Sequence, residues 1–305
     1  MSAARDAGRG STDLETVEAA VAAAHGAEAV APGVLRLPLA TPTLPPATTT
    51  NHVLVGRHRG LVIDPATPLA AGQSQLVALC RALERDAGWR FHGLLLTHHH
   101  RDHVGGAAPI ASALGLPIFA HPRTAALVAE ALPRCLPVAD GDDVGGALSG
   151  SGPGWRALHT PGHAPGHIAL VHPAGGVVAG DLVAGEGTIL IDPSDGDMAL
   201  YLASLRRVLA LPPTWLIPAH GPVLADGAAV LSATLAHRLA REARVLAALD
   251  DEARSDDALL PRAYGDVPRR TWPLALRSLR SHLWHLERQG LAMRDGERWR
   301  RAQPS

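Results

Sequence analysis

One histidine-rich stretch of this chain limits the folds and functions that the sequence is compatible with. The segment LTHHHRDHVGG, residues 96–106, places four of the seventeen histidines and one aspartate within six consecutive positions. Such a cluster can be a metal site, a solvated loop or part of an affinity tag. Tags occur at chain ends and do not carry an aspartate at a ligand position, so the internal location favours a metal site.

Short apolar runs alternate with helical patterns around this segment. Helices are predicted over SQLVALCRALER and DMALYLASLRRVLAL, where leucines recur at helical spacing, and over GGAAPIASALG. This alternation predicts an α/β protein with layered sheets. The predicted strands are HVLVG, GLVID, FHGLLLT, LPIFAH, WRALHT, HIALVH, GGVVAG and TWLIPAH.

The two ends of the chain differ from this middle part. Residues 1–30 are predicted to be an extension that is disordered over 1–12 and helical over 14–24. The main domain is predicted over residues 31–236. Residues 237–305 predict three helices and a hairpin with an Asp295-Gly296 turn, which is the outline of a winged-helix unit. We expect Trp284, which lies among leucines, to pack in the core of this unit.

Composition excludes several classes of protein. The longest apolar runs are far shorter than the roughly 20 residues that span a bilayer, so no membrane association is expected. Acidic residues interrupt the first twenty positions, which argues against a secretory signal. Two cysteines do not suggest a disulfide framework, so we predict a cytoplasmic protein. Cys80 is expected to be a core residue. The oligomeric state stays open.

Seven side chains could bind metal. Each lies beyond the carboxyl end of a predicted strand, where α/β proteins commonly place ligands. Imidazole and carboxylate ligands without sulfur suit zinc, and also manganese or iron. The seven residues are His98, His100, Asp102, His103, His163, Asp181 and His220.

Four motifs in this order resemble the metallo-beta-lactamase fold superfamily. They are H-x-H-x-D-H from residue 98, TPGH, AGD and PAHGP, and the resemblance covers about residues 34–240. It implies an αββα sandwich, followed here by the winged-helix-like unit, that binds two divalent ions. By position, His98, His100 and His163 would bind one ion, Asp102, His103 and His220 the second, and Asp181 would bridge them.

The resemblance also implies a reaction. A hydroxide shared by the two ions would attack a carbonyl carbon or phosphorus, and Asp102 would hold it and take its proton. Superfamily members that open β-lactams often have cysteine where this chain has Asp181, which argues against antibiotic hydrolysis. The sequence shows no dedicated proton donor, which favours leaving groups such as thiolates that need no proton.

The carboxyl-terminal third of the chain bears on the class of substrate and leaves alternatives open. It resembles a group that contains both single-strand-specific endoribonucleases and acyl-carrier-protein thioesterases. We therefore expect a hydrolase of small esters or thioesters, of acyl-CoA or acyl-carrier type. An endoribonuclease acting on single-stranded RNA is the alternative, and residues 237–305 carry 14 Arg against 10 Asp and Glu. The third possibility is a non-catalytic metal-binding module whose winged helix docks on DNA or a partner.

Four further residues have candidate roles. His167, in TPGHAPGH, is expected to support a metal ligand rather than bind metal itself. His237, Arg238 and Arg241 lie on one stretch of a predicted helix and fit an HR..RE pattern. They could reach an anionic group of the substrate, or they could lie on a solvated helix face.

Overall fold

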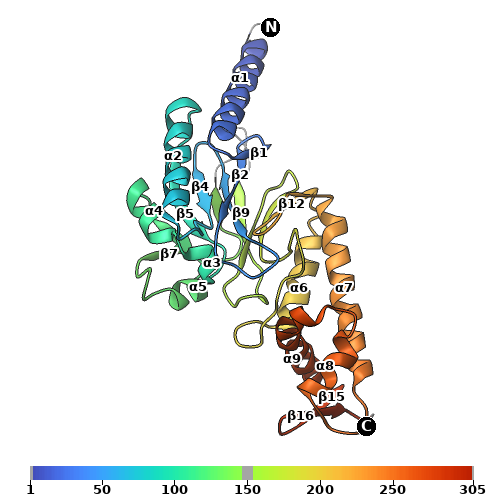
Figure 1. Cartoon of the computed structure of the whole chain (residues 1–305). Coiled ribbons are helices and arrows are strands. Elements are labelled where there is room, and N and C mark those ends of the chain that lie inside the picture. The colour runs from blue at the N-terminus through green and yellow to red at the C-terminus, as the bar shows by residue number, and fades with distance from the viewer. Residues whose placement is uncertain (1–2, 146–153, 304–305) are drawn as a thin grey trace. The chain divides into compact units, whose positions relative to one another are not determined.

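The computed structural model describes residues 3–145 and 154–303 (Figure 1). Contacts divide the chain into two compact units. The first unit comprises residues 1–159, 166–187 and 214–225, and the second comprises 160–165, 188–213 and 226–305. Within the described ranges, every helix is too short or too polar to cross a membrane.

A seven-stranded mixed sheet forms one layer of the first unit. Its strands follow the order of the chain, antiparallel from β1 to β4 and parallel from β4 to β7. The predicted HVLVG–GLVID pair is confirmed as β3 and β4. The strands are β1 (Glu28–Ala31), β2 (Val34–Ala40), β3 (Thr49–Val55), β4 (Gly60–Ile63), β5 (Phe91–Leu96), β6 (Ile118–Ala120) and β7 (Cys135–Pro137).

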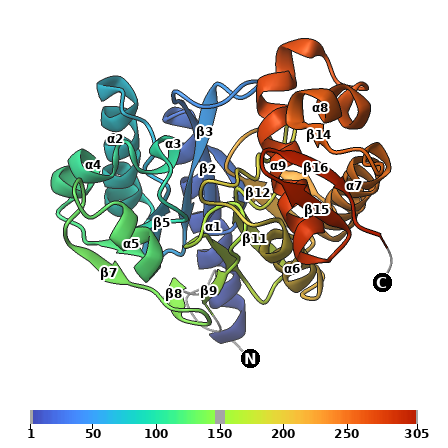
Figure 2. The ribbon, with the colours of Figure 1, turned by 90° about the horizontal axis from the view of Figure 1, so that it is seen from below.

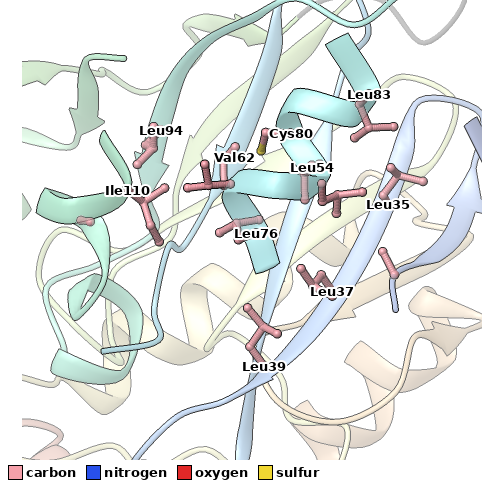
Figure 3. Close-up of a cluster of buried hydrophobic side chains, with 14 of the residues drawn as sticks. Leu35, Leu37, Leu39, Leu54, Val62, Leu76, Cys80, Leu83, Leu94 and Ile110 are labelled. Carbon is pink, nitrogen blue, oxygen red and sulfur yellow. The ribbon is translucent and has the colours of Figure 1, made fainter. Parts of the chain in front are cut away.

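Helices α2 (Ala70–Asp86) and α4 (Ala107–Leu114) cover one face of this sheet (Figure 2). Leucines of α2 pack against Leu35, Leu54 and Leu94 of the strands, as Figure 3 shows. Cys80 is fully buried among them, which confirms its predicted place in the core, and burial raises the pKa of its thiol. The short helices are α3 (Arg101–Val104) and α5 (Pro122–Leu127).

A second, six-stranded sheet packs against the other face of the first. Val53, Ile63 and Leu95 of the first sheet share a core with Trp155 and Ile217 of the second. The layered sheets predicted from the sequence are therefore present. In spatial order the strands are β13 (Leu224–Ala225), β12 (Trp215–Pro218), β11 (Gly176–Gly180), β10 (Ile168–Val171), β9 (Trp155–His159) and β8 (Asp143–Gly145).

The second unit is mainly helical and ends in a small sheet. Leu279, Leu283 and Leu286 of its last helix are buried around Trp299, as the leucine spacing predicts. Trp284 is 41% exposed, so its predicted core position is wrong. It follows Leu283 by one residue and therefore points about 100° away from the buried stripe. The elements are α6 (Met198–Leu209), α7 (Gly227–Ala248), β14 (Arg254–Ser255), α8 (Asp256–Tyr264), a 3₁₀ turn (Arg269–Thr271), α9 (Trp272–Arg288), β15 (Ala292–Asp295) and β16 (Arg298–Arg301).

The first helix, α1 (Ala3–Ala24), is longer than predicted and includes most of the stretch expected to be disordered. It is fixed to the first unit by Glu18, which is 2% exposed. The Glu18 carboxylate accepts hydrogen bonds from the Gly33 N–H (2.9 Å), Arg57 Nε (2.7 Å) and Trp89 Nε1 (3.0 Å). Because the side chain of Arg57 is also buried, this contact is a buried ion pair.

Glu18→Ala should lower the free energy of unfolding by about 3 kcal/mol, because the Arg57 charge would stay buried without its partner. Urea denaturation measures this difference. The matched change at an exposed glutamate, Glu130→Ala, should alter stability by less than about 0.5 kcal/mol. Equal stability of the two variants would show that α1 does not depend on this ion pair.

Candidate metal centre

The predicted ligands follow the strand ends as expected. His98 lies two residues beyond β5, Asp181 directly follows β11, and His220 lies two residues beyond β12. His163 follows β9 in the turn 160–163, which belongs to the second unit. Asp102 and His103 lie on α3, a single helical turn. The sequence placed them ahead of a helix starting near Gly105, so the helical geometry begins earlier than predicted.

A buried carboxylate, Asp64, organises this region, and the sequence analysis missed it. Asp64 directly follows β4 and has a left-handed backbone (φ 48°). Its Oδ1 accepts the Thr97 N–H (2.7 Å), and its Oδ2 accepts the Thr97 hydroxyl (2.7 Å) and His103 Nδ1–H (2.8 Å). Because Nδ1 is engaged by Asp64, it is Nε2 of His103 that faces Asp102 and Asp181. An aspartate at the end of the run GLVID was the available signal.

The paired glycines of the opening motif close α3 against the loop that follows Asp64. A Cβ at Gly105 would lie 2.8 Å from the Ala66 carbonyl oxygen, and one at Gly106 would lie 2.5 Å from that of Thr67. On the other side of this loop, His52 Nε2 accepts the N–H groups of Ala66 (3.0 Å) and Thr67 (3.2 Å). Burial lowers the pKa of His52 to about 4, so it acts as a neutral acceptor.

Three predicted ligands lie near His103 Nε2. It lies 3.7 Å from Asp181 Oδ2 and 4.0 Å from Asp102 Oδ1, while His220 Nε2 lies 3.6 Å from Asp102 Oδ2 and 3.7 Å from Asp181 Oδ1. Ligand atoms of Asp102, His103 and His220 all lie within 4.8 Å of one another. Among the described residues, the buried His103 Nε2 has no hydrogen-bond partner. A buried imidazole nitrogen beside carboxylates suits a divalent cation, which would take the place of a proton.

The electrostatic surroundings of His103 also favour a bound cation. Complete burial acts to lower the pKa of the imidazole, but the carboxylates of Asp64 and Asp181 outweigh it and raise the pKa well above its ordinary value. The negative potential that favours a proton here would equally favour a metal cation. Since histidine binds metal through a neutral ring nitrogen, metal uptake would release that proton.

A second group of ligand atoms combines His98, His103 and Asp181, also within 4.8 Å of one another. The Thr97 hydroxyl already donates to Asp64, so it accepts from His98 Nδ1 (3.0 Å). His98 Nε2 then faces His100 Nδ1 at 2.9 Å. In the second unit, His163 Nδ1 donates to the Leu190 carbonyl (2.9 Å) and leaves the lone pair on Nε2. The binding of one ion by His98, His100 and His163 stays a prediction.

Hydrogen bonds hold the remaining ligands in place. His220 Nδ1 donates to the Thr49 carbonyl (2.9 Å), and His167 Nε2 accepts the Asp181 N–H (3.0 Å). Gly180 makes the second contact possible, because a Cβ there would lie 2.6 Å from His167 Nε2 and its φ is +53°. His167 therefore contacts the backbone of a predicted ligand, which is the type of role that the sequence suggested.

Two threonines that the sequence analysis missed contact Asp102. The Thr43 hydroxyl donates to Asp102 Oδ2, and the Thr50 hydroxyl donates to the Asp102 carbonyl oxygen (2.9 Å). Both come from the segment TPTLPPATTT, which is distant in sequence, so no local spacing signals the contact. Thr43 thus orients the carboxylate that is predicted to take a proton, and Thr50 holds the backbone of the same residue.

The three α7 candidates lie in different surroundings. Arg238 and Arg241 are 3% and 8% exposed, which excludes a solvated helix face for both, whereas His237 is exposed. Arg241 pairs with Asp266 (2.9 Å), and its guanidinium lies 4.3 Å from the centre of the Tyr264 ring. Arg238 donates to the Ile189 carbonyl. Their contact with an anionic substrate group stays a prediction.

Two sheets with a cluster of histidine and aspartate side chains beyond their strand ends are typical of a metal-binding α/β protein. Residues 45–220 match the model of the metallo-beta-lactamase superfamily, and residues 255–299 match that of the beta-lactamase associated winged helix domain. The chain therefore belongs to the metallo-beta-lactamase superfamily and carries a carboxyl-terminal winged helix domain. The resemblance inferred from the motifs is confirmed, and the protein is a hydrolase of this fold.

Curated relatives are similar over about two thirds of the chain. A beta-lactamase-like protein 2 homolog of Drosophila melanogaster is 29% identical over 65% of this chain and 68% of its own length. An atrochrysone carboxyl ACP thioesterase of Aspergillus terreus is 28% identical over 69% of this chain and 61% of its own length, which is less than two thirds of that protein. A hydroxyacylglutathione hydrolase of Rhodobacter capsulatus is 32% identical over 63% of this chain and 79% of its own length.

A solved structure shares the whole fold. A beta-lactamase domain protein from Burkholderia ambifaria superposes with a TM-score of 0.78 at 22% identity, and the match covers 92% of this chain and 94% of that one. The predicted combination of a sandwich with a winged-helix unit is confirmed by this match and by the two family models.

His103→Ala should reduce the bound metal by about one ion per chain, because the Nε2 ligand of the predicted second ion is lost. Elemental analysis of the purified variant measures this stoichiometry. His58→Ala, at an exposed histidine, is the matched control and should keep the wild-type content. An unchanged metal content in His103→Ala would contradict this assignment.

Asp64→Asn should weaken metal binding by about 10- to 100-fold without removing a ligand, because the partner that orients a metal-binding histidine tunes the affinity of the site. The amide keeps the shape of the side chain but loses its charge and one acceptor. Titration against a chelator of known zinc affinity measures the change. Wild-type affinity in a folded Asp64→Asn protein would show that the carboxylate is not needed for the site.

Proposed function

We propose that this protein is a dinuclear metal-dependent hydrolase of small esters or thioesters, of acyl-CoA or acyl-carrier type. The observation that carries the proposal is the convergence of Asp102, His103, Asp181 and His220 at adjacent strand ends, with Nε2 of His103 buried and facing carboxylates. Such a set of imidazole and carboxylate ligands has the composition of a hydrolytic metal centre.

The cofactor is proposed to be two divalent ions, zinc in preference to manganese or iron. His98, His100 and His163 would hold one ion and Asp102, His103 and His220 the other, with Asp181 between them. When bound, such ions lower the pKa of a shared water and neutralise the charge that develops on the substrate oxygen.

Asp102 is the residue proposed to act directly in the reaction. Its carboxylate lies within 4.0 Å of two imidazoles, His103 and His220, where it can orient a water and take its proton. The Thr43 hydroxyl donates to one of its oxygens and fixes the plane of the carboxylate. A proton-accepting side chain typically contributes 10²- to 10⁴-fold to the rate.

The choice of thioesters rests on chemistry and on the relatives. Two of the relatives are named as an ACP thioesterase and a hydroxyacylglutathione hydrolase. A thiolate is expelled without a proton donor, since thiols have a pKa of about 8.5. Asp181 stands at the position where lactam-hydrolysing members often have cysteine, which disfavours an antibiotic as the substrate.

Single-stranded RNA is the second candidate substrate. The winged helix domain favours it, because Arg294, Arg298 and Arg301 are exposed on its hairpin and could contact phosphates. Asp295 and Glu297 at the tip of the same hairpin reduce this charge, so the small thioester is preferred. A metal-binding module that docks on DNA or a partner without turnover is the third candidate.

The zinc-loaded protein should release free thiol from at least one member of an acyl-CoA panel and leave labelled single-stranded RNA intact. Asp102→Ala should lower the rate at least about 100-fold, and His58→Ala should not change it. Thiol detection and gel electrophoresis of the RNA give the two readouts. RNA cleavage that Asp102→Ala abolishes, without thiol release, would establish the second candidate. Retention of duplex DNA without either reaction would favour the third.

A further inference from the structure

The turn that carries His163 is anchored inside the second unit. The Ser204 hydroxyl donates to the Pro161 carbonyl (2.7 Å), and the Asp197 N–H donates to the Gly162 carbonyl (2.8 Å). Gly162 has a φ of +133°, and a Cβ there would lie 2.2 Å from the Tyr201 backbone nitrogen. The turn thus lies directly against the first turns of α6, with no space for a side chain at the glycine.

The orientation of the His163 ring depends on a second segment. Its Nδ1 donates to the Leu190 carbonyl (2.9 Å), so the position of this carbonyl decides which way Nε2 points. The carbonyl of the preceding residue, Ile189, accepts a hydrogen bond from the Arg238 guanidinium on α7. Arg238 therefore holds the peptide next to the one that orients His163.

Arg238 also contacts the support of the turn. Its guanidinium lies 5.2 Å from the centre of the Tyr201 ring, and the backbone of Tyr201 is the surface against which Gly162 packs. One buried cation thus contacts both segments that determine the position of His163. A charge that is 3% exposed is costly to bury, and packing alone would be better served by an apolar side chain.

Two further arginines act on the same segment from α9. Arg277 pairs with Asp192, two residues beyond Leu190, and Arg288 pairs with Asp197 (2.6 Å). Both arginine side chains are about half exposed, so each pair contributes little by itself. Arg238 is the buried member of the three and the one whose contact adjoins Leu190.

We propose that Arg238 is a positioning residue for His163: by holding the Ile189 carbonyl and the Tyr201 ring, it sets the orientation in which the imidazole presents Nε2 to a metal ion. The inference rests on the proposed dinuclear site. It gives α7 a part in orienting a proposed ligand, instead of a role limited to substrate contact or stability.

Arg238→Met is the test, because methionine fills the space of the side chain but removes the charge and the donors. It should weaken the binding of one Zn²⁺ ion by about tenfold in a chelator-competition titration and leave the other ion unaffected. Arg241→Met is the matched control, since Arg241 is also a buried α7 arginine but contacts Asp266 and Tyr264. It should destabilise the protein without changing either zinc affinity.

A double-mutant cycle with His163→Ala separates positioning from general damage. In the His163→Ala background, Arg238→Met should cause no further loss of zinc affinity, because both changes act on the same ligand. The visible spectrum of the Co²⁺-substituted protein should change in Arg238→Met and not in Arg241→Met. Wild-type affinity for both ions in folded Arg238→Met, or additive losses in the cycle, would overturn the proposal.

The same titration keeps the two proposals apart. A wild-type chain that binds no Zn²⁺ overturns the dinuclear site itself, whereas two ions bound with the same affinities by wild type and by Arg238→Met overturn only the role of Arg238. If Arg238→Met does not fold, Arg238→Lys replaces it, because lysine keeps the positive charge but loses the planar guanidinium that contacts both the Ile189 carbonyl and the Tyr201 ring. Arg238→Lys should weaken the binding of the same ion about threefold, and an unchanged affinity would contradict the inference.

Discussion

The three hydrogen bonds accepted by the Asp64 carboxylate are the interaction on which the candidate site depends. They join the end of β4 to the end of β5 and to α3, and they fix the proton of His103 on Nδ1. Asp64 sits in a left-handed backbone conformation that aspartate tolerates better than most residues. The carboxylates of Asp64 and Asp181 together raise the pKa of His103 and create the negative potential that favours a cation.

The second unit stabilises its loops in a different way, with arginines that bind carbonyls and aromatic rings. Arg241 spans Ala263, Asp266 and Tyr264, and Arg238 spans Ile189 and Tyr201. A planar guanidinium has five donors in fixed directions, so it can satisfy several groups of an irregular segment at once. Every basic residue of this chain other than its histidines is an arginine. All of its permanently charged basic side chains can therefore make contacts of this kind with several acceptors.

The strands, the main helices and the gathering of ligands at strand ends could be predicted because their signals are local. Apolar runs indicate the strands, and a candidate ligand that directly follows a strand must lie at the end of that strand. Asp64, Thr43 and Glu18 could not be found in this way, because their partners lie 33, 59 and 39 residues away. Trp284 was misplaced because it lies between leucines in the sequence, and the prediction did not follow the turn of about 100° that separates its side chain from that of Leu283 on the helix.

The second unit is assembled from three separate stretches of chain, 160–165, 188–213 and 226–305. A fragment cut ahead of α7 would retain the first two stretches without the helices that stabilise them. The terminal helices are for this reason a poor module for exchange: grafting a foreign winged helix onto this chain would also remove Arg277 and Arg288 of α9, whose partners Asp192 and Asp197 lie in the 188–213 stretch. Engineering of specificity through the tail would have to keep α6 and α7 as one block.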